Sequence, residues 1–232
     1  MKALVGVMMV LFMLLSRPIA EAEEKGIKVA ILDSGCNIPY KEGISLIDRS
    51  LKDYNSHGTL MARIIKEKAP FVELYIIKVM DRDGFCVNDE AVIRGIEWAI
   101  SKEVDLINMS LGLEDSDKLQ KVISKAYNKG IVIIAAAGNE GMEVAYPAKY
   151  NEVIAVGAVN KYGKVYAGSV KGKDVEVVSR GYYGRQAGTS IASAYAVGIA
   201  ARIIFAQKLF LQPEALKSVI LQMAKKTGGE LK

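Results

Sequence analysis

The chain contains a single histidine, His57. One imidazole cannot build the multi-histidine sites that hold most catalytic zinc ions. It is enough, however, to act as a general base toward a hydroxyl group, because its ordinary pKa of about 6.5 lies close to neutrality. Such a base works best when a carboxylate fixes its tautomer and stabilises its cation. The sequence offers a carboxylate, Asp33, and a hydroxyl, Ser190, in settings that suit these two tasks.

These residues lie where elements of secondary structure are expected to begin or end. Asp33 follows the apolar run 27–32, His57 opens a segment of helical spacing, and Ser190 opens a helix rich in small residues. A helix N-terminus favours negative charge, which suits a hydroxyl that attacks a carbonyl group and leaves an oxyanion beside it. Asn139 lies in a Gly-Asn-Glu-Gly turn, from which its amide can donate to that oxyanion.

The elements that must position these residues alternate between two periodicities. Short runs rich in Val and Ile predict strands buried on both faces of a parallel sheet, over 27–32, 72–79, 104–109, 131–137, 153–159 and 175–178. Helical spacing predicts helices over 59–68, 89–101, 116–128, about 189–208, and from Pro213 onward. This alternation predicts one α/β domain with a mostly parallel central sheet and helices on both faces, whose functional residues collect at the carboxyl ends of the strands.

Length and composition favour one compact domain. The chain has 232 residues, of which 51% are hydrophobic and 25% charged. Its net charge of +5 is too small to indicate a nucleic-acid partner, and no run of Lys and Arg stands out. The two cysteines, Cys36 and Cys86, fit no zinc or redox spacing, so a disulfide and two free thiols both remain open.

The N-terminus has the pattern of an export signal. Lys2 precedes an apolar run of about 13 residues, which is short of the roughly 20 that span a bilayer, and Ala20-Glu21-Ala22 follows as a small-x-small triplet. We expect a signal peptide over 1–22 and a domain over 23–232 that is secreted or exported to the cell envelope, without stable membrane insertion after cleavage. An uncleaved anchor or a buried helix is the alternative.

Four short blocks that carry the chemical residues resemble the signature blocks of the subtilases, the subtilisin-like serine proteases. They are Ile31-Leu32-Asp33-Ser34-Gly35, His57-Gly58-Thr59, Ala136-Ala137-Gly138-Asn139 and Gly188-Thr189-Ser190-Ile191-Ala192-Ser193. Their order, aspartate then histidine then serine, is also that of the subtilisins. Similar segments at 78–81, 95–99 and 107–112 extend the resemblance over nearly all of the chain beyond the predicted signal.

The resemblance implies a serine endopeptidase that acts on proteins or peptides through an acyl-enzyme and needs no cofactor. Ser190 would be the nucleophile, His57 the general base and then acid, and Asp33 the orienting carboxylate. Asn139 and the backbone N–H of Ser190 would form the oxyanion hole. The residues implied in substrate binding are backbone at Ser110, Leu111, Gly112 and Gly84, and the pocket-lining Ala137 and Gly138.

The sequence departs from the family pattern at two positions beside these blocks. Ala194 stands where a proline usually follows the serine block, and Leu60 replaces a histidine that is common after the histidine block. We expect a small effect on stability from the first and none on catalysis from the second.

Two further departures concern metal binding and folding. The short segment between the aspartate and histidine blocks lacks the acidic loop of calcium-binding relatives, and Asp48 and Asp53 alone do not predict a metal site. No propeptide separates the predicted signal from Lys25, so we expect the domain to fold unaided or with a separate folding helper or inhibitor.

Two other readings of the same residues stay open. Asp-Ser-Gly after an apolar strand also resembles the aspartic proteases, although a second copy is absent and that family is all-β. A non-catalytic, peptide-binding subtilase homologue is the other alternative, and such a protein would be expected to have lost one of the three catalytic residues. Taken singly, Asp33 and Ser190 also fit helix caps, and Asn139 fits a turn residue.

Overall fold

The computed structural model describes residues 26–139, 143–207, 212–226 and 230–231. Within these ranges one sheet has the strand order β10-β7-β6-β5-β4-β1-β3-β2, and all of its neighbouring strands are parallel. Its strands are β1 (Lys28–Asp33), β2 (Glu42–Ser45), β3 (Glu73–Lys78), β4 (Leu106–Met109), β5 (Val132–Ala136), β6 (Val153–Val159), β7 (Val177–Arg180) and β10 (Glu230–Leu231). A small antiparallel hairpin joins β8 (Tyr182–Tyr183) to β9 (Gln186–Ala187).

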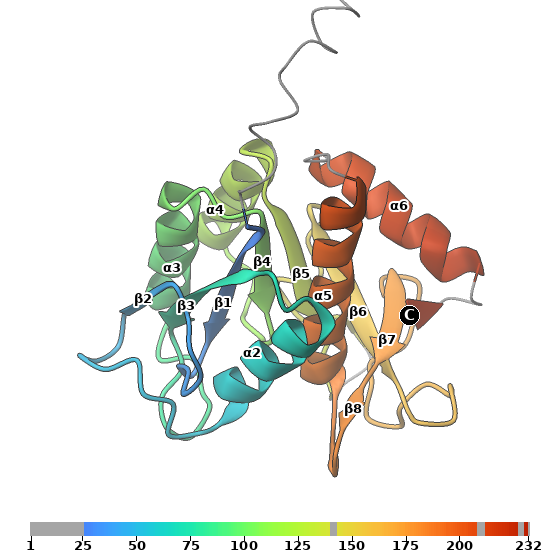
Figure 1. The fold of residues 1–232 in the computed structure, drawn as a ribbon, viewed down its shortest axis with the longest axis horizontal. Helices are drawn as coiled ribbons and strands as arrows, with labels where there is room; N and C mark the ends of the chain where they lie inside the picture. The colour runs from blue at the N-terminus through green and yellow to red at the C-terminus, as the bar shows by residue number, and fades with distance from the viewer. Residues whose placement is uncertain (1–25, 140–142, 208–211, 227–229, 232) are drawn as a thin grey trace, which may run out of the picture.

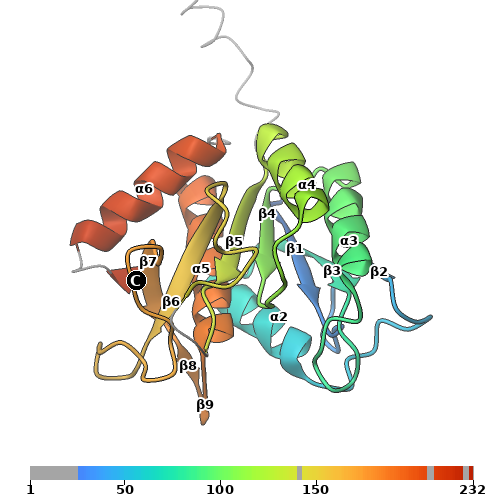
Figure 2. The same ribbon diagram turned by 180° about the vertical axis from the view of Figure 1, so that it is seen from behind.

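Helices cover both faces of this sheet. On one face lie α2 (His57–Lys68), α5 (Thr189–Gln207) and α6 (Pro213–Lys226), with α2 and α5 in front of the sheet in Figure 1. On the other face lie α3 (Asp89–Ser101) and α4 (Asp117–Asn128), which are nearest the viewer in Figure 2. The expected α/β architecture is therefore confirmed, and the aspartic-protease alternative is wrong because that family is all-β.

The sheet divides the buried side chains into two apolar layers. Along β1, Val29 and Ile31 belong to the layer under α2 and α5, whereas Ala30 and Leu32 belong to the layer under α3 and α4. This alternation explains why the strands read as unbroken apolar runs, since both of their faces are covered. The layers hold the carboxyl ends of β1, β4 and β5 in fixed positions.

Most predicted elements are confirmed, with bounds that match or differ by one or two residues. Helix α4 begins at Asp117 with Ser116 as its N-cap, and it ends before Gly130, whose φ of 87° suits a residue that follows a helix. The edge strand β2 was not expected because its residues are partly exposed and form no apolar run. The predicted strand 175–178 lies two residues later, as β7. The predicted signal peptide lies outside the described residues.

One described helix, α5, is long and apolar enough by composition to cross a membrane. Its apolar window is 78% buried inside the protein. It packs against α2 and the sheet, and a Cβ added at Gly198 would lie 2.5 Å from the Cβ of Lys68. We therefore interpret α5 as the core helix of the domain.

Candidate functional site

The imidazole and the carboxylate predicted to act together are in direct contact. Asp33 ends β1 and is fully buried, and His57 is the first residue of α2. His57 Nδ1 lies 2.8 Å from Asp33 Oδ1. Because a carboxylate only accepts hydrogen bonds, Nδ1 carries the proton and Nε2 of the neutral ring keeps its lone pair.

The charge of Asp33 sets the basicity of this imidazole. It raises the pKa of His57 above its ordinary value, burial of the ring opposes the shift, and the hydrogen bond that His57 donates to Asp33 and the charge of Asp53 reinforce it. Asp33 Oδ1 also accepts a hydrogen bond from the backbone N–H of Ser34 at 2.8 Å, and the Ser34 hydroxyl lies 3.2 Å from it. Its Oδ2 is buried and has no hydrogen-bond partner among the described residues. His57 therefore shares the hydrogen-bonding capacity of this carboxylate with few other donors.

A second buried carboxylate, Asp53, holds the turn that presents His57. Its Oδ2 accepts hydrogen bonds from the backbone N–H and hydroxyl of Thr59, at 2.8 and 2.6 Å, and its Oδ1 accepts from the N–H of Ser56 at 2.8 Å. The Ser34 hydroxyl lies between the two acids, and its single proton goes to the nearer one, Asp53 Oδ1 at 2.9 Å, rather than to Asp33 Oδ1 at 3.2 Å. Burial would raise the pKa of Asp53, but these hydrogen bonds outweigh burial and lower it.

The hydrogen bonds that Asp53 and Ser34 accept at the start of α2, which we call the clamp, explain how this helix begins without a side-chain cap from Ser56. The preceding residue, Ser56, has φ of 73° in the left-handed region and makes no side-chain cap. The first orphan N–H groups of α2 are met from outside instead, by Ser34 Oγ at Gly58 and by Asp53 at Thr59. A non-glycine residue in this backbone region carries strain that the surrounding structure must hold. Sequence reasoning weighed Asp53 only as a metal ligand and missed this role, although an acid shortly before a helix start is a common capping signal.

Ser190 is the second residue of α5, so its backbone N–H has no acceptor within the helix. Its side chain is half-buried, and its hydroxyl lies 3.5 Å from the carbonyl oxygen of Ser110, at the outer limit of a hydrogen bond. No hydrogen bond joins it to His57 in the described part of the chain. The two side chains do line the same pocket, of about 320 Å³.

Asn139 lines that pocket as well, and its amide orientation is determined by its neighbours. Its Oδ1 accepts from the backbone N–H of Thr189 at 2.8 Å and from the Thr189 hydroxyl at 3.1 Å. The backbone N–H can only donate, so the oxygen must face it and the Nδ2 group points elsewhere. Asn139 thereby caps the N-terminus of α5 and keeps its two N–H donors for another partner.

Four of the six residues predicted to bind substrate line a second pocket beside His57, whereas Ala137 and Gly138 do not line it. This pocket has a volume of about 420 Å³, and its lining includes Gly84, Ser110, Leu111, Gly112 and His57. Ala137 and Gly138 follow β5, and the N–H of Gly138 lies 3.3 Å from the hydroxyl of Thr189. The structure thus places all the predicted site residues at the carboxyl edge of the sheet.

Both cysteines are free thiols in this structure, so the pairing left open by the sequence is not formed. Cys36 is buried after β1, whereas Cys86 lines the second pocket near His57. Burial raises the pKa of the Cys86 thiol to about 12, and nearby acids add to the effect. This thiol therefore stays protonated at neutral pH and is a poor competitor for the role of nucleophile.

The acids considered for calcium are occupied by protein donors. Asp48 Oδ2 accepts from the buried ammonium group of Lys78 at 2.8 Å, and both oxygens of Asp53 are engaged as described above. Among the residues that the structure describes, no group of three or more His, Cys, Asp or Glu side chains is placed to hold a metal ion.

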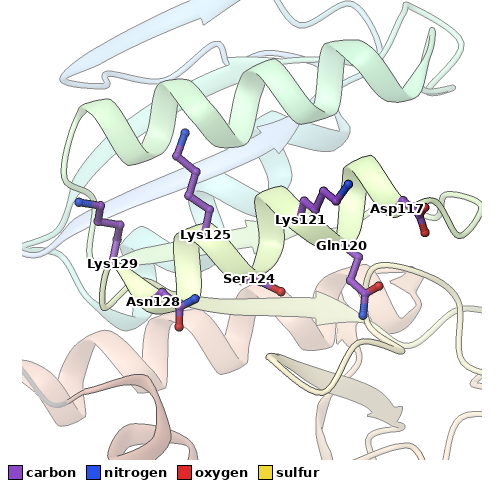
Figure 3. Close-up of a pocket in the computed structure, with 7 residues that line it drawn as sticks. All are labelled: Asp117, Gln120, Lys121, Ser124, Lys125, Asn128 and Lys129. Carbon is purple, nitrogen blue, oxygen red and sulfur yellow. The ribbon is translucent and has the colours of Figure 1, made fainter.

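A larger hollow, of about 740 Å³, runs along the exposed side of α4 and contains none of these residues (Figure 3). It is lined by Asp117, Gln120, Lys121, Ser124, Lys125, Asn128 and Lys129. These residues belong to α4 or to its C-cap, Lys129, and the Lys125 ammonium lies 3.7 Å from Glu97 of α3, an arrangement that is usual for a solvated helix face.

Comparison with known proteins finds relatives among the subtilisin-like proteases. Subtilisin E of Bacillus subtilis (strain 168) is 38% identical over 211 residues, which cover 77% of this chain and 55% of that protein. The major intracellular serine protease of the same organism is 32% identical over 243 residues, covering 88% of this chain and 76% of that protein. A crystal structure of a cold-adapted subtilisin-like serine proteinase superposes with a TM-score of 0.76 at 24% identity, covering 85% of this chain and 81% of that one, and supports the fold.

A sequence model of the subtilase family, Peptidase_S8, matches residues 24–232. This range includes the contact between Asp33 and His57, the helix start that bears Ser190 and the turn that bears Asn139. The chain therefore belongs to the subtilase family, the subtilisin-like serine proteases.

Proposed function

We propose that this protein is a serine endopeptidase that cleaves peptide bonds through an acyl-enzyme. The observation that carries the proposal is the 2.8 Å contact between His57 Nδ1 and Asp33, which leaves the Nε2 lone pair for a pocket that Ser190 also lines. A hydroxyl is a weak nucleophile until a base removes its proton, and His57 is the single imidazole of the chain. This arrangement supports the three catalytic roles that the resemblance implies for Asp33, His57 and Ser190.

In the proposed acylation step, the Ser190 hydroxyl turns from the Ser110 carbonyl toward His57 Nε2. Its oxygen then attacks the carbonyl carbon of the substrate while the proton passes to Nε2. The oxyanion that forms is stabilised by the N–H of Ser190 and by Asn139 Nδ2, and the α5 N-terminus adds a favourable field. The imidazolium, stabilised by Asp33, next gives its proton to the leaving amine. Water then repeats these steps on the ester and frees Ser190.

The substrate is proposed to be a peptide in an extended conformation. Residues 110–112 leave β4 at its carboxyl end, and the facing wall of the 420 Å³ pocket comes from residues 83–86. An extended peptide between these walls can pair with their backbone as an added strand. The exposed Phe85, with 71% of its surface accessible, lies on one wall and can contact apolar side chains of the substrate.

Labelling with a fluorophosphonate tests this function, because the probe reacts covalently only with an activated serine. We expect one label per chain on the wild type, none on Ser190→Ala, and a rate lower by several orders of magnitude on His57→Ala. Labelling of Ser190→Ala would contradict the assignment of the nucleophile. A wild type that folds and binds peptides but takes up no label would support the non-catalytic homologue instead.

Export is a separate proposal, supported by the charged, apolar and small-residue pattern of residues 2–22. The similarity to an intracellular protease shows that family membership leaves the compartment undecided. N-terminal sequencing of the protein from culture medium and from cells tests it. A new N-terminus at Glu23 outside the cell is expected, and accumulation of intact chains inside the cell would contradict it.

We further propose that a separate helper or inhibitor assists folding if the domain cannot fold by itself. Refolding of the purified chain from denaturant, followed by fluorophosphonate labelling, tests this. Recovery of full labelling without any added protein would contradict a need for a helper.

A further inference from the structure

A buried chain of hydrogen bonds links α5 to β4 beneath the proposed nucleophile. Ser193 Oγ lies 2.9 Å from Asn108 Oδ1, Asn108 Nδ2 lies 3.1 Å from Ser110 Oγ, and Ser110 Oγ lies 3.1 Å from the carbonyl oxygen of Ser190. Asn108 and Ser193 are fully buried, and Ser110 is 4% exposed. The chain begins and ends on α5, and it passes through β4 between these two points.

The direction of every bond in this chain is determined by its members. The Asn108 amide nitrogen can only donate, so Ser110 Oγ accepts a hydrogen bond from it. The Ser110 hydroxyl therefore donates its own proton to the carbonyl oxygen of Ser190. At the other end the Ser193 hydroxyl donates to Asn108 Oδ1, and its alternative acceptor, the carbonyl of Ile134, is more distant at 3.4 Å. Each side chain thus satisfies the next, so loss of one hydroxyl leaves a buried polar group without its partner.

We propose that Asn108 and Ser193 are positioning residues that hold the Ser190 backbone in place for attack on the substrate. Ser110 and Ser190 are linked twice, because the Ser190 hydroxyl also points back to the Ser110 carbonyl at 3.5 Å. These two links therefore fix the distance between Ser110, in the segment that would pair with substrate, and Ser190, which would attack it. A displacement of about 1 Å at a reacting atom can cost a hundredfold in rate.

The polar side chains of Asn108 and Ser193 argue against a role in packing alone. A buried amide between a helix and a strand is unfavourable unless it is hydrogen-bonded, and an apolar residue there would pack without this requirement. Ala192 and Val197 of the same helix belong to the apolar layer between α5 and the sheet. The polar link occurs at the first turn of α5, where Ser190 lies.

The inference rests on the proposed peptidase function, and its test uses kinetics that separate position from stability. We would measure kcat, KM, the rate constant of fluorophosphonate labelling and the unfolding midpoint for Ser193→Ala, Ser193→Cys and Asn108→Ala. Rate constants are expressed per site that finally takes up label, so partial unfolding of a variant does not count as slow chemistry. Failure of the proposed function appears separately, as a wild type that takes up no label.

The matched control is Ser179→Ala. Ser179 is also fully buried and makes one side-chain hydrogen bond, to the carbonyl of Leu231 at 3.1 Å, but it lies in β7 near the far edge of the sheet. Its substitution removes a comparable buried bond and leaves the proposed nucleophile untouched. We expect it to lower the unfolding midpoint while kcat stays within twofold of the wild type.

For Ser193→Ala and Asn108→Ala we expect kcat and the labelling rate to fall by about tenfold to a hundredfold, with KM within about threefold. Ser193→Cys keeps a weak donor and should fall between the wild type and Ser193→Ala. The double variant should be little slower than the slower single variant, because both changes break one chain. A kcat loss no greater than that of the control, a loss confined to KM, or independent effects in the double variant would each overturn the proposal.

Discussion

The proposed role of the Asn139 amide in stabilising the oxyanion can be tested with a single substitution. Asn139→Ala removes the Nδ2 donor and leaves the backbone N–H of Ser190 as the remaining donor to the oxyanion. Loss of one donor from such a pair costs about 2.7–4 kcal/mol of transition-state stabilisation, which is about 10²–10³ in kcat. Because this interaction strengthens only as the oxyanion forms, KM should change little.

The same substitution also has a structural cost that the structure allows us to separate. Asn139 Oδ1 caps α5 through its 2.8 Å and 3.1 Å contacts with Thr189, and loss of a helix cap costs about 1 kcal/mol of folding stability. Thr189→Val serves as the matched variant, because it removes the 3.1 Å contact, together with the 3.3 Å contact to the N–H of Gly138, and keeps the backbone N–H contact and the Nδ2 donor. Thr189→Val should therefore lose less than about tenfold in kcat while sharing part of the stability loss.

The assay is steady-state hydrolysis of a peptide amide, with active-site concentration determined by titration. A chemical denaturation curve for each variant reports the free energy of unfolding. If Asn139→Ala retains kcat within threefold of the wild type, the assignment of Nδ2 to the oxyanion is wrong. If Thr189→Val loses as much as Asn139→Ala, the effect comes from the start of α5 and the electrostatic argument fails.

Three further predictions concern the base and the turn that carries it. Because Asp33 raises the pKa of His57, kcat/KM should fall to half at a pH above about 6.5 as the solution is acidified, and a midpoint at or below that value would contradict the pairing. Asp53→Asn removes a negative charge that also raises this pKa, so the midpoint measured from the pH profile should move to lower pH; an unmoved midpoint would show that Asp53 acts only as a clamp. Gly58→Ala places a Cβ 2.3 Å from the carbonyl oxygen of Gly35 and should lower kcat/KM at least about a hundredfold by displacing His57, whereas activity within tenfold would show that the turn adapts.

The strands that could be predicted from the sequence are those buried on both faces of the sheet. Strands β1, β3 and β6 read as short apolar runs because helices cover both of their sides, and α3 matches its predicted bounds from Asp89 to Ser101. The strands that were missed lack this signal. The edge strand β2 is partly exposed, and β8, β9 and β10 have only two residues each, so backbone pairing alone defines them.

The candidate site divides in a similar way. Asp33, His57, Asn139 and Ser190 stand at ends of elements in short blocks, so their types and order were readable from the chain. Their geometry was not, because the 2.8 Å contact between Asp33 and His57 depends on where β1 stops relative to the start of α2. Sequence reasoning gave no account of Asn108 and Ser193, since a bond between residues 85 positions apart leaves no local pattern.

The residues that cap α2 and α5 show how a site made from distant segments is held together. Both proposed reacting side chains lie in the first turn of a helix, where backbone N–H groups lack intrahelical partners and side-chain positions depend on the cap. In each case the cap comes from another segment: Asp53 and Ser34 at α2, and Asn139 at α5. The groups that complete these helix ends are therefore the groups that align the chemistry. Substitutions at them should change rate and stability together. Substitutions in the Asn108 chain should also lower stability, because they leave a buried polar group without its partner, but their loss of rate should exceed that of the Ser179→Ala control.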